Sequence, residues 1–275
     1  MKIIVLKGVH IISEFTYIIY NELKQYYDVE YKDKYDPNDK EILHFIISPQ
    51  EDNNMPNRYI IYNLEPMNYR SKKHNKHNNH NKYIEKIRKA EIVWEYSKTN
   101  LSIIKKLNKN VIYKPFFYSK FMEKLYNIEN DCKKDIDVLF YGLMNSRRNK
   151  IIEDLKKEGI NIYSPNYPEN KPVWLKDKFD LIKRSKIVIN IHYHSELNDQ
   201  TNDLLRIMFL LANKVVVVQE ETNDKDIDEE LKEIIVPYDG IVKRCKELLI
   251  DNQNIGDKMY NIVKTKMFLN LNGTI

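Results

Sequence analysis

The stretch SKIVINIHYHSELNDQTNDLLRIMFLLANKVVVVQE, residues 185–220, decides the fold class. Its apolar runs predict a buried strand at 186–191 and a second one at 215–218. Between them the sequence predicts a polar loop at 192–201 and an apolar helix at 202–212. Strand, helix and strand in this order form a βαβ unit of a parallel sheet.

Polar side chains gather at three places of this unit. They follow the first strand, occupy the first turns of the helix and follow the second strand: Asn190, His192, Tyr193 and His194; Asn202 and Arg206; Gln219, Glu220 and Glu221. In an open parallel sheet these places lie at one carboxyl edge, where ligands bind in the crevice outside the strands. The stretch is therefore a candidate binding site as well as a core.

The alternation of strand and helix continues on both sides of this stretch. Residues 136–254 repeat strand and helix regularly, residues 1–117 form a shorter α/β pattern, and the polar segment 118–135 separates them. We therefore expect two α/β domains with parallel, doubly wound sheets, joined by a linker. A final helix within 255–275 is expected to pack back across the domains.

Short apolar runs set the elements expected in each domain. The first domain is predicted to contain strands at 2–6, 29–31, 42–47, 59–62, 91–94 and 111–113, and helices at 13–26 and 97–107. The second is predicted to add strands at 136–141, 160–163 and 234–236, and helices at 147–158, 174–184, 241–250 and 257–269. Such strands suit sheets that are covered on both faces.

The composition is that of a globular protein with balanced charge. The 275 residues include 45 basic and 40 acidic ones, for a net charge of +5, whereas a nucleic-acid-binding protein gathers a larger basic excess. No apolar run approaches the roughly 18 residues of a membrane span, and the start MKIIVLKGVH lacks a signal-peptide pattern. Cys132 and Cys245 lie far apart, which favours free thiols. We expect a cytoplasmic protein without nucleic-acid partners or a membrane span.

Three histidines at a spacing of three lie in the polar segment RSKKHNKHNNHNK: His74, His77 and His80. A metal site needs a defined set of ligands and a second shell. This segment contains no Cys or carboxylate, and Asn and Lys fill the positions between the histidines. We interpret it as a solvated, low-complexity loop and expect no metal site.

The turn FYGLMNSRRNK, residues 140–150, follows the first strand of the second domain. Gly142 allows a close approach to the backbone, and Asn145 or Ser146 can cap the next helix. Arg147 and Arg148 then stand in the first turn of that helix, where the macrodipole favours anions. A bound phosphate would explain two arginines there; a solvated basic turn is the alternative.

Arg206 is the one charged side chain of the apolar run 204–212 in the predicted helix. An unpaired buried guanidinium costs several kcal/mol, so Arg206 needs a partner. That partner is either Asp203, three residues earlier, or a ligand phosphate shared with Arg147 and Arg148.

Glu220 and the two histidines of the stretch also admit two interpretations. Glu220 follows four valines and could accept two hydroxyls of a ribose or hexose, or be a solvated loop acid. His192 and His194 could donate to phosphate or sugar oxygens, or act as acid or base, or be surface residues.

Seven segments together resemble family-1-type glycosyltransferases with the B-type, twin-Rossmann (GT-B) fold, in a branch found in bacteria and large DNA viruses: YIIYNLEP (59–66), IVWEYSKTN (92–100), VIYKPF (111–116), DVLFYGLMNSRRNKII (137–152), SKIVINIHYH (185–194), NDLLRI (202–207) and VVVVQEET (215–222). The resemblance rests on their order and spacing. It implies two Rossmann-like domains whose parallel sheets face each other across a cleft, with the nucleotide sugar bound by the second domain.

The resemblance also suggests roles for individual residues of the second domain. It places Gly142, Arg147 and Arg148 near the phosphates, Arg206 beneath them, and Glu220 at the family's acidic position. Two departures from the family pattern concern that position. Gln219 replaces a small hydroxyl residue, and the pair of glutamates spaced eight apart is absent, because Ala212 and Asn213 stand eight residues before Glu220 and Glu221.

The expected function is the transfer of a sugar from a nucleoside-diphosphate sugar to the hydroxyl of a glycan or other acceptor, without a metal or other cofactor. His10 after the first strand or Glu65 in NLEP would face the cleft from the first domain as catalytic base. The alternative is a non-catalytic nucleotide-sugar-binding module, because the first domain is short for this fold and shows no clear base.

Overall fold

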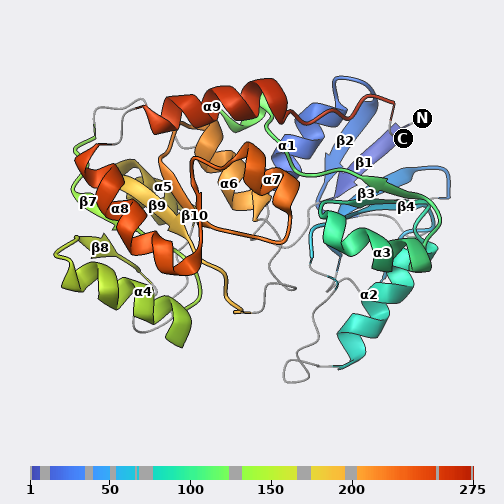
Figure 1. Cartoon of the computed structure of the whole chain (residues 1–275). Coiled ribbons are helices and arrows are strands. Elements are labelled where there is room, and N and C mark those ends of the chain that lie inside the picture. Colours follow the sequence, from blue (N-terminus) through green and yellow to red (C-terminus); the bar gives the residue numbers. More distant parts are fainter. Residues whose placement is uncertain are drawn as a thin grey trace. The chain divides into compact units, whose positions relative to one another are not determined.

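The computed structural model describes residues 2–6, 13–34, 40–49, 54–65, 67, 77–123, 132–165, 175–195, 203–251, 254–273 and 275 (Figure 1). The chain divides into two compact units, Met1–Phe116 with Leu269–Ile275, and Phe117–Phe268. Each unit contains one all-parallel sheet. The predicted α/β class with two Rossmann-like sheets is confirmed. The cleft between them stays a prediction.

The first unit has a six-stranded sheet with the order β2-β1-β3-β4-β5-β6. Its strands are β1 (Lys2–Leu6), β2 (Asp28–Lys32), β3 (Leu43–Ile47), β4 (Tyr59–Asn63), β5 (Ile92–Glu95) and β6 (Val111–Tyr113). Its helices are α1 (Ser13–Leu23), α2 (His77–Lys89) and α3 (Lys98–Leu107). β3 and β4 are buried along their whole length, which confirms that both faces of this sheet are covered.

The two faces of this sheet differ in character. On one face, Ile61 and Val93 pack with Ile87 of α2 and Ile104 of α3. Side chains alternate along a strand, so Phe45, Tyr62 and Trp94 point to the other face. There the rings of Phe45 and Trp94 lie 4.7 Å apart and those of Tyr62 and Trp94 lie 5.6 Å apart, edge to face. Packed aromatic rings thus fix three neighbouring strands.

The structure corrects the interpretation of the histidine-rich segment. Residues 77–80 form the first turn of α2 instead of a loop; residues 68–76, and the side chains of 77–80, lie outside the described residues. Tyr83 and Ile87, four residues apart, are 4% and 0% exposed and bury one face of the helix. Most helical stability comes from such packing, which explains why a polar sequence continues a helix here.

The second unit has a five-stranded sheet with the order β11-β10-β9-β7-β8. Its strands are β7 (Ile136–Leu139), β8 (Ile162–Tyr163), β9 (Ser185–Asn190), β10 (Val217–Glu220) and β11 (Ile235–Val236). In both units the second strand lies outside the first, and the third lies on the first strand's other side. This order creates a topological switch point at β1/β3 and another at β7/β9, where ligands bind in open sheets.

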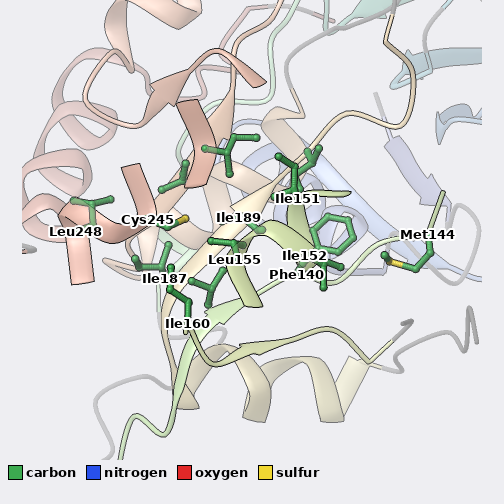
Figure 2. Close-up of a cluster of buried hydrophobic side chains, with 14 residues drawn as sticks. Phe140, Met144, Ile151, Ile152, Leu155, Ile160, Ile187, Ile189, Cys245 and Leu248 are labelled. Carbon is green, nitrogen blue, oxygen red and sulfur yellow. The ribbon is translucent and has the colours of Figure 1, made fainter. Parts of the chain in front are cut away.

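The core of the second unit lies between this sheet and two helices, α4 (Ser146–Lys157) and α8 (Ile241–Ile250). Figure 2 shows Ile187 and Ile189 of β9 against Ile152 and Leu155 of α4, with Cys245 of α8 among them. The unit also contains α5 (Leu175–Arg184), α6 (Leu204–Ala212), α7 (Lys225–Glu230), α9 (Ile255–Lys266) and the short 3-10 helices η2 (Lys120–Met122) and η4 (Tyr238–Gly240). No helix in the described ranges is long and apolar enough to cross a membrane.

Two segments near the unit boundaries are held by specific hydrogen bonds. In the second unit, Asn213 at the end of α6 donates to the carbonyl of Met122 in η2 at 2.9 Å. The same side chain donates to Phe209 O at 2.8 Å. In the first unit, Lys114 donates to the carbonyl of Asn270 at 2.7 Å. The chain therefore returns from α9 to the first unit through residues 269–273.

Candidate functional site

The candidate site of the second unit lies at the carboxyl edge of its sheet, at the β7/β9 switch point. Three loops meet there, after β7, β9 and β10, together with the first turns of α4 and α6. The residues predicted for this site and described by the structure come from these five segments and from Glu220, the last residue of β10.

The turn after β7 connects the start of α4 to the loop after β9. Asn145 is the N-cap of α4, as predicted: its side chain accepts from Arg148 N at 2.9 Å. The same side chain donates to Tyr193 O at 2.6 Å and so ties the β7 and β9 loops together. A Cβ on Gly142 would lie 2.9 Å from Phe140 Cζ and 3.4 Å from Arg148 Nη1. The close approach predicted at Gly142 is thus to the protein's own side chains.

Arg148 is a buried cation, only 8% exposed. Its guanidinium donates to Ile191 O at 3.0 and 2.5 Å and to Leu143 O at 2.7 Å. No carboxylate in the described parts of the chain hydrogen-bonds or ion-pairs with it. Burial, and then the nearby charge of Arg206, lower the pKa of Arg148 to about 10. It is therefore still protonated at neutral pH. Its hydrogen bonds go to carbonyls, and the nearby charge of Asp203 offsets part of its positive charge without a direct contact.

Arg147 forms a bidentate ion pair with Glu220, which is 2% exposed. One arm, from Nη1 to Oε2, is 2.8 Å long, and the same oxygen accepts from His192 N at 2.9 Å. The Arg147 guanidinium lies 3.9 Å from the centre of the Tyr238 ring. The two residues predicted for phosphate and for sugar are therefore bound to each other, and Glu220 is no solvated loop acid.

The position of Glu220 also corrects the predicted strand. β10 begins two residues later than expected, so Glu220 is its last residue. The chain first completes the end of α6: Val215 N donates to Leu210 O at 3.0 Å, and Lys214 adopts a left-handed φ of 58°. These helix-end bonds take up residues that an apolar run alone assigns to the strand.

Arg206 contacts both a predicted and an unpredicted partner. Its Nε lies 3.5 Å from Asp203 Oδ2, and Nη1 donates to Asn190 Oδ1 at 2.7 Å. The side chain is 25% exposed, whereas most of α6 is buried as predicted. Asn190 in turn donates to Gln219 Oε1 at 2.6 Å. Arg206 therefore lies on a polar layer across β9 and β10, and part of its side chain remains exposed to solvent.

The β9 loop carries three further predicted residues. His192 Nε2 lies 3.1 Å from Glu221 O, and burial lowers the pKa of this imidazole. His192 is thus neutral at pH 7. Tyr193 is 38% exposed, and its ring centre lies 5.1 Å from that of His194 and 5.2 Å from the Arg148 guanidinium. This places Tyr193 beside the buried cation. Asn202 lies outside the described residues.

The residues predicted as base belong to the first unit. His10 lies outside the described residues. Glu65 is exposed in the loop after β4, and its main chain is held from two sides, by Asn63 and Asn100.

Three residues at the two carboxyl edges were missed from the sequence. Tyr141 lies 4.9 Å below the Arg206 guanidinium and Tyr238 stacks on Arg147; an aromatic residue just after a strand is the only local signal for them. In the first unit, Glu95 ends β5 and is 0% exposed. An acid that closes the apolar run IVWE is the signal that could have found it.

The chemistry of the second edge is that of an anion site. Three guanidiniums, from Arg147, Arg148 and Arg206, gather there with two carboxylates, Glu220 and Asp203. Guanidinium groups bind phosphate in a forked geometry. Across the described ranges, no group of three His, Cys, Asp or Glu side chains could hold a metal ion.

Comparison with known proteins supports the fold more than any activity. No family model matches the sequence. Two uncharacterised proteins of Acanthamoeba polyphaga mimivirus are similar: L138 is 28% identical over 161 residues, covering 57% of this chain and 17% of that protein, and L140 is 27% identical over 177 residues, covering 62% and 54%. The chain thus spans about a sixth of the first relative and about half of the second.

Two solved structures are similar over nearly the whole chain. A candidate UDP-N-acetylglucosamine 2-epimerase from Listeria monocytogenes has a TM-score of 0.52 at 8% identity and covers 95% of this chain and 91% of that one. A structure of the wall teichoic acid polymerase TagF has a TM-score of 0.46 at 13% identity and covers 96% and 84%. The first likeness supports the twin-Rossmann, GT-B-like fold alone, and the second is too weak to add to it.

Proposed function

We propose that the chain is a glycosyltransferase that moves a sugar from a nucleoside-diphosphate sugar to an acceptor hydroxyl. In this proposal the diphosphate binds at the arginine-rich edge of the second unit. The observation that carries it is Arg148, a buried guanidinium at the switch point that donates its hydrogen bonds to carbonyl oxygens. The sequence resemblance to family-1-type glycosyltransferases supports the reaction class.

A bound anion would relieve an energetic cost at this edge. Burying a cation without a counter-charge costs several kcal/mol, and the positive charges of Arg206 and Arg147 add repulsion to Arg148. The N-terminus of the twelve-residue helix α4 lies beside them, and its dipole also favours an anion. Arg206 is the most exposed of the three arginines, at 25% against 15% for Arg147, so we assign it the direct contact with the diphosphate.

The contribution to catalysis is electrostatic. Negative charge grows on the diphosphate as the bond to the sugar breaks, and fixed cations near it stabilise that charge most in the transition state. Arg148 and Arg206 are proposed to supply this stabilisation, with no step that requires a metal. Arg147 is neutralised by Glu220, so we assign this pair to holding the loop at His192 instead of to the phosphates.

The first unit is proposed to handle the acceptor. Glu65 is the described candidate for the base that takes the proton of the acceptor hydroxyl, and His10 is the second candidate. A base must come within hydrogen-bond reach of the hydroxyl in the substrate complex.

A non-catalytic nucleotide-sugar-binding module is the second candidate function. The observation in its favour is that Glu220 is occupied by Arg147 and His192 N. Glu220 is thus not open to the hydroxyls of a donor sugar.

Incubation with UDP-, GDP- and dTDP-sugars, without acceptor or metal, tests the proposal. Slow release of nucleoside diphosphate from one donor is expected of the enzyme, with the rate strongly reduced in Arg206→Ala. Binding without turnover under a panel of acceptors supports the binding module. Absence of affinity for every nucleotide sugar, together with salt-sensitive binding of DNA, contradicts both functions.

A further inference from the structure

The first unit contains a buried carboxylate that no part of the proposed function uses. Glu95 is the last residue of β5 and is 0% exposed. Its Oε2 accepts from Asn63 Nδ2 at 2.6 Å. Its Oε1 accepts from Ser97 N at 2.8 Å and from Asn100 Nδ2 at 2.9 Å. The carboxylate thus gathers donors from β4, from the turn after β5 and from the first turn of α3.

The two amides that bind Glu95 also bind one carbonyl of the β4 loop. Asn63 donates to Glu65 O at 3.0 Å, and Asn100 donates to the same oxygen at 2.9 Å. Each NH₂ group therefore donates one hydrogen bond to Glu95 and the other to Glu65 O. Asn100 Oδ1 further accepts from Met67 N at 2.8 Å. The main chain on both sides of Pro66 is held by side chains that Glu95 orients.

The remaining contacts fix the orientation of the Asn63 amide. Its Oδ1 accepts from the hydroxyl of Tyr83, which is 4% exposed, at 2.5 Å. Oδ1 also accepts from Glu65 N at 3.3 Å. With the oxygen so occupied, the NH₂ group must face Glu95, and a carboxylate is the group that can accept from it.

The charge state of Glu95 matters because every contact made to its side chain is an N–H donor. Burial raises the pKa of Glu95 to about 7, against the opposing effect of these donors. The titratable groups that interact with its charge are Tyr62 of β4 and Tyr83 of α2, and Tyr83 also interacts with Glu65 and Tyr96. Burial keeps the pKa of Tyr62 and of Tyr83 well above the usual range. Glu95 is thus the group of this network that changes charge near neutral pH.

We infer that Glu95 is a positioning residue: through the paired amides of Asn63 and Asn100, its carboxylate fixes the main chain at Glu65. The loop so fixed carries the carboxylate that the proposed function assigns as base. That last step rests on the proposed function, whereas the fixing of the loop does not.

A role confined to fold stability would leave a different signature. Protonation of Glu95 removes a buried charge, which favours the folded unit as a whole. It also replaces an acceptor with an O–H that faces donors, which weakens the hold on the loop. Protection of the Met67 amide against hydrogen exchange should therefore fall as Glu95 is neutralised. Protection of Val93 N, which donates to Asn110 O in the sheet, should stay the same or rise. A purely structural residue would lower both.

Hydrogen exchange of the ¹⁵N-labelled full chain tests the inference, in wild type, Glu95→Gln and the matched control Glu91→Gln. Glu91 precedes the same strand and pairs with exposed Arg58. In Glu95→Gln we expect Met67 to exchange about tenfold faster, since a buried donor loses its acceptor. Val93 should change less than about twofold, and the control should match wild type. Wild type should show the same loss at Met67, corrected for the intrinsic rate, between pH 9 and pH 5.

The outcomes separate this inference from the proposed function. Faster exchange at Met67 in Glu95→Gln supports the clamp even if no nucleotide sugar is consumed, in which case only the proposed function fails. If a donor is consumed, kcat should fall in Glu95→Gln at unchanged donor KM; equal kcat would overturn the catalytic part. Should Glu95→Gln not fold, the wild-type pH series decides. Met67 protection that is constant between pH 5 and pH 9 overturns the inference.

Discussion

The first five strands of each sheet have the same order, but the two sheets carry opposite chemistry at their carboxyl edges. In the second unit, three guanidiniums gather at the β7/β9 switch point. One of them, Arg148, is buried and forms no hydrogen bond or ion pair with a carboxylate of the described residues. In the first, the described polar network lies at β4/β5 and centres on a buried carboxylate, Glu95, held by amides. The fold supplies two equivalent edges, and the residues that follow the strands decide which one attracts an anion.

The largest effect on stability is expected from breaking the ion pair between Arg147 and Glu220 at the carboxyl edge of the second sheet. Replacing Glu220 by Gln leaves Arg147 without its buried counter-ion, so the free energy of unfolding should fall by about 4 kcal/mol. Urea denaturation of the full chain measures it. Glu221→Gln is the control, because Glu221 is 40% exposed and pairs with exposed Lys225; its effect should stay within about 0.5 kcal/mol. A loss below about 1 kcal/mol in Glu220→Gln would show that the pair is not structural.

At the carboxyl edge of the first sheet, Glu95 should make the stability of the protein depend on pH. The pKa of Glu95 is raised to about 7 in the folded chain, above its unfolded value, so its contribution is fully present below about pH 4 and is lost as the pH rises through 7. At about 1.4 kcal/mol per pKa unit, the loss amounts to roughly 3–4 kcal/mol.

The stability difference between wild type and Glu95→Gln isolates this contribution from other titrations. Between pH 5 and pH 8, wild type should lose stability relative to Glu95→Gln. A difference that does not depend on pH would mean that Glu95 keeps one charge state throughout.

A smaller loss is expected from Gly142→Ala. The new Cβ would meet Phe140 Cζ at 2.9 Å and Arg148 Nη1 at 3.4 Å, so the buried guanidinium must shift, at about 1–2 kcal/mol. Gly240→Ala, whose Cβ would lie 3.4 Å from Pro237, should be nearly neutral in the same thermal unfolding experiment. Equal stability of the two variants would show that the turn after β7 accommodates the added Cβ without strain.

The smallest effect is expected at the opposite edge of the second sheet. Arg184 and Asp135 precede β9 and β7 and form an exposed ion pair at 2.7 Å, with side chains 46% and 43% exposed. Arg184→Gln should change stability by less than about 0.5 kcal/mol and leave nucleotide affinity, measured by calorimetry, unchanged. A loss of nucleotide affinity in Arg184→Gln would show that binding does not depend on the carboxyl edge of the second sheet alone.

Local patterns in the sequence predicted the sheets well because buried parallel strands are short apolar runs. The helix caps at Ser97 and Asn145 were also predictable, since a cap is formed by residues two or three positions apart. α2 was not, because its upstream half is polar and only the burial of Tyr83 and Ile87 shows its apolar face.

The candidate site was predictable in place but not in pairing. The switch-point loops were identified, yet Arg147 and Glu220 are separated by 73 residues and Arg148 and Ile191 by 43. Those contacts depend on how strands align, which no local spacing reports. Glu95 was overlooked because its amide partners, Asn63 and Asn100, come from different elements.

The most direct test of the central claim is the affinity of UDP, GDP and dTDP for wild type and for Arg206→Ala, measured by calorimetry. Arg206 is 25% exposed and is the proposed contact to the diphosphate. We predict that wild type binds at least one of the three, and that Arg206→Ala stays folded but binds it at least tenfold more weakly, the loss of one charge-assisted contact. Equal affinity in folded Arg206→Ala would contradict the account. Arg206 would then have only a structural role, through its contacts with Asp203 and Asn190.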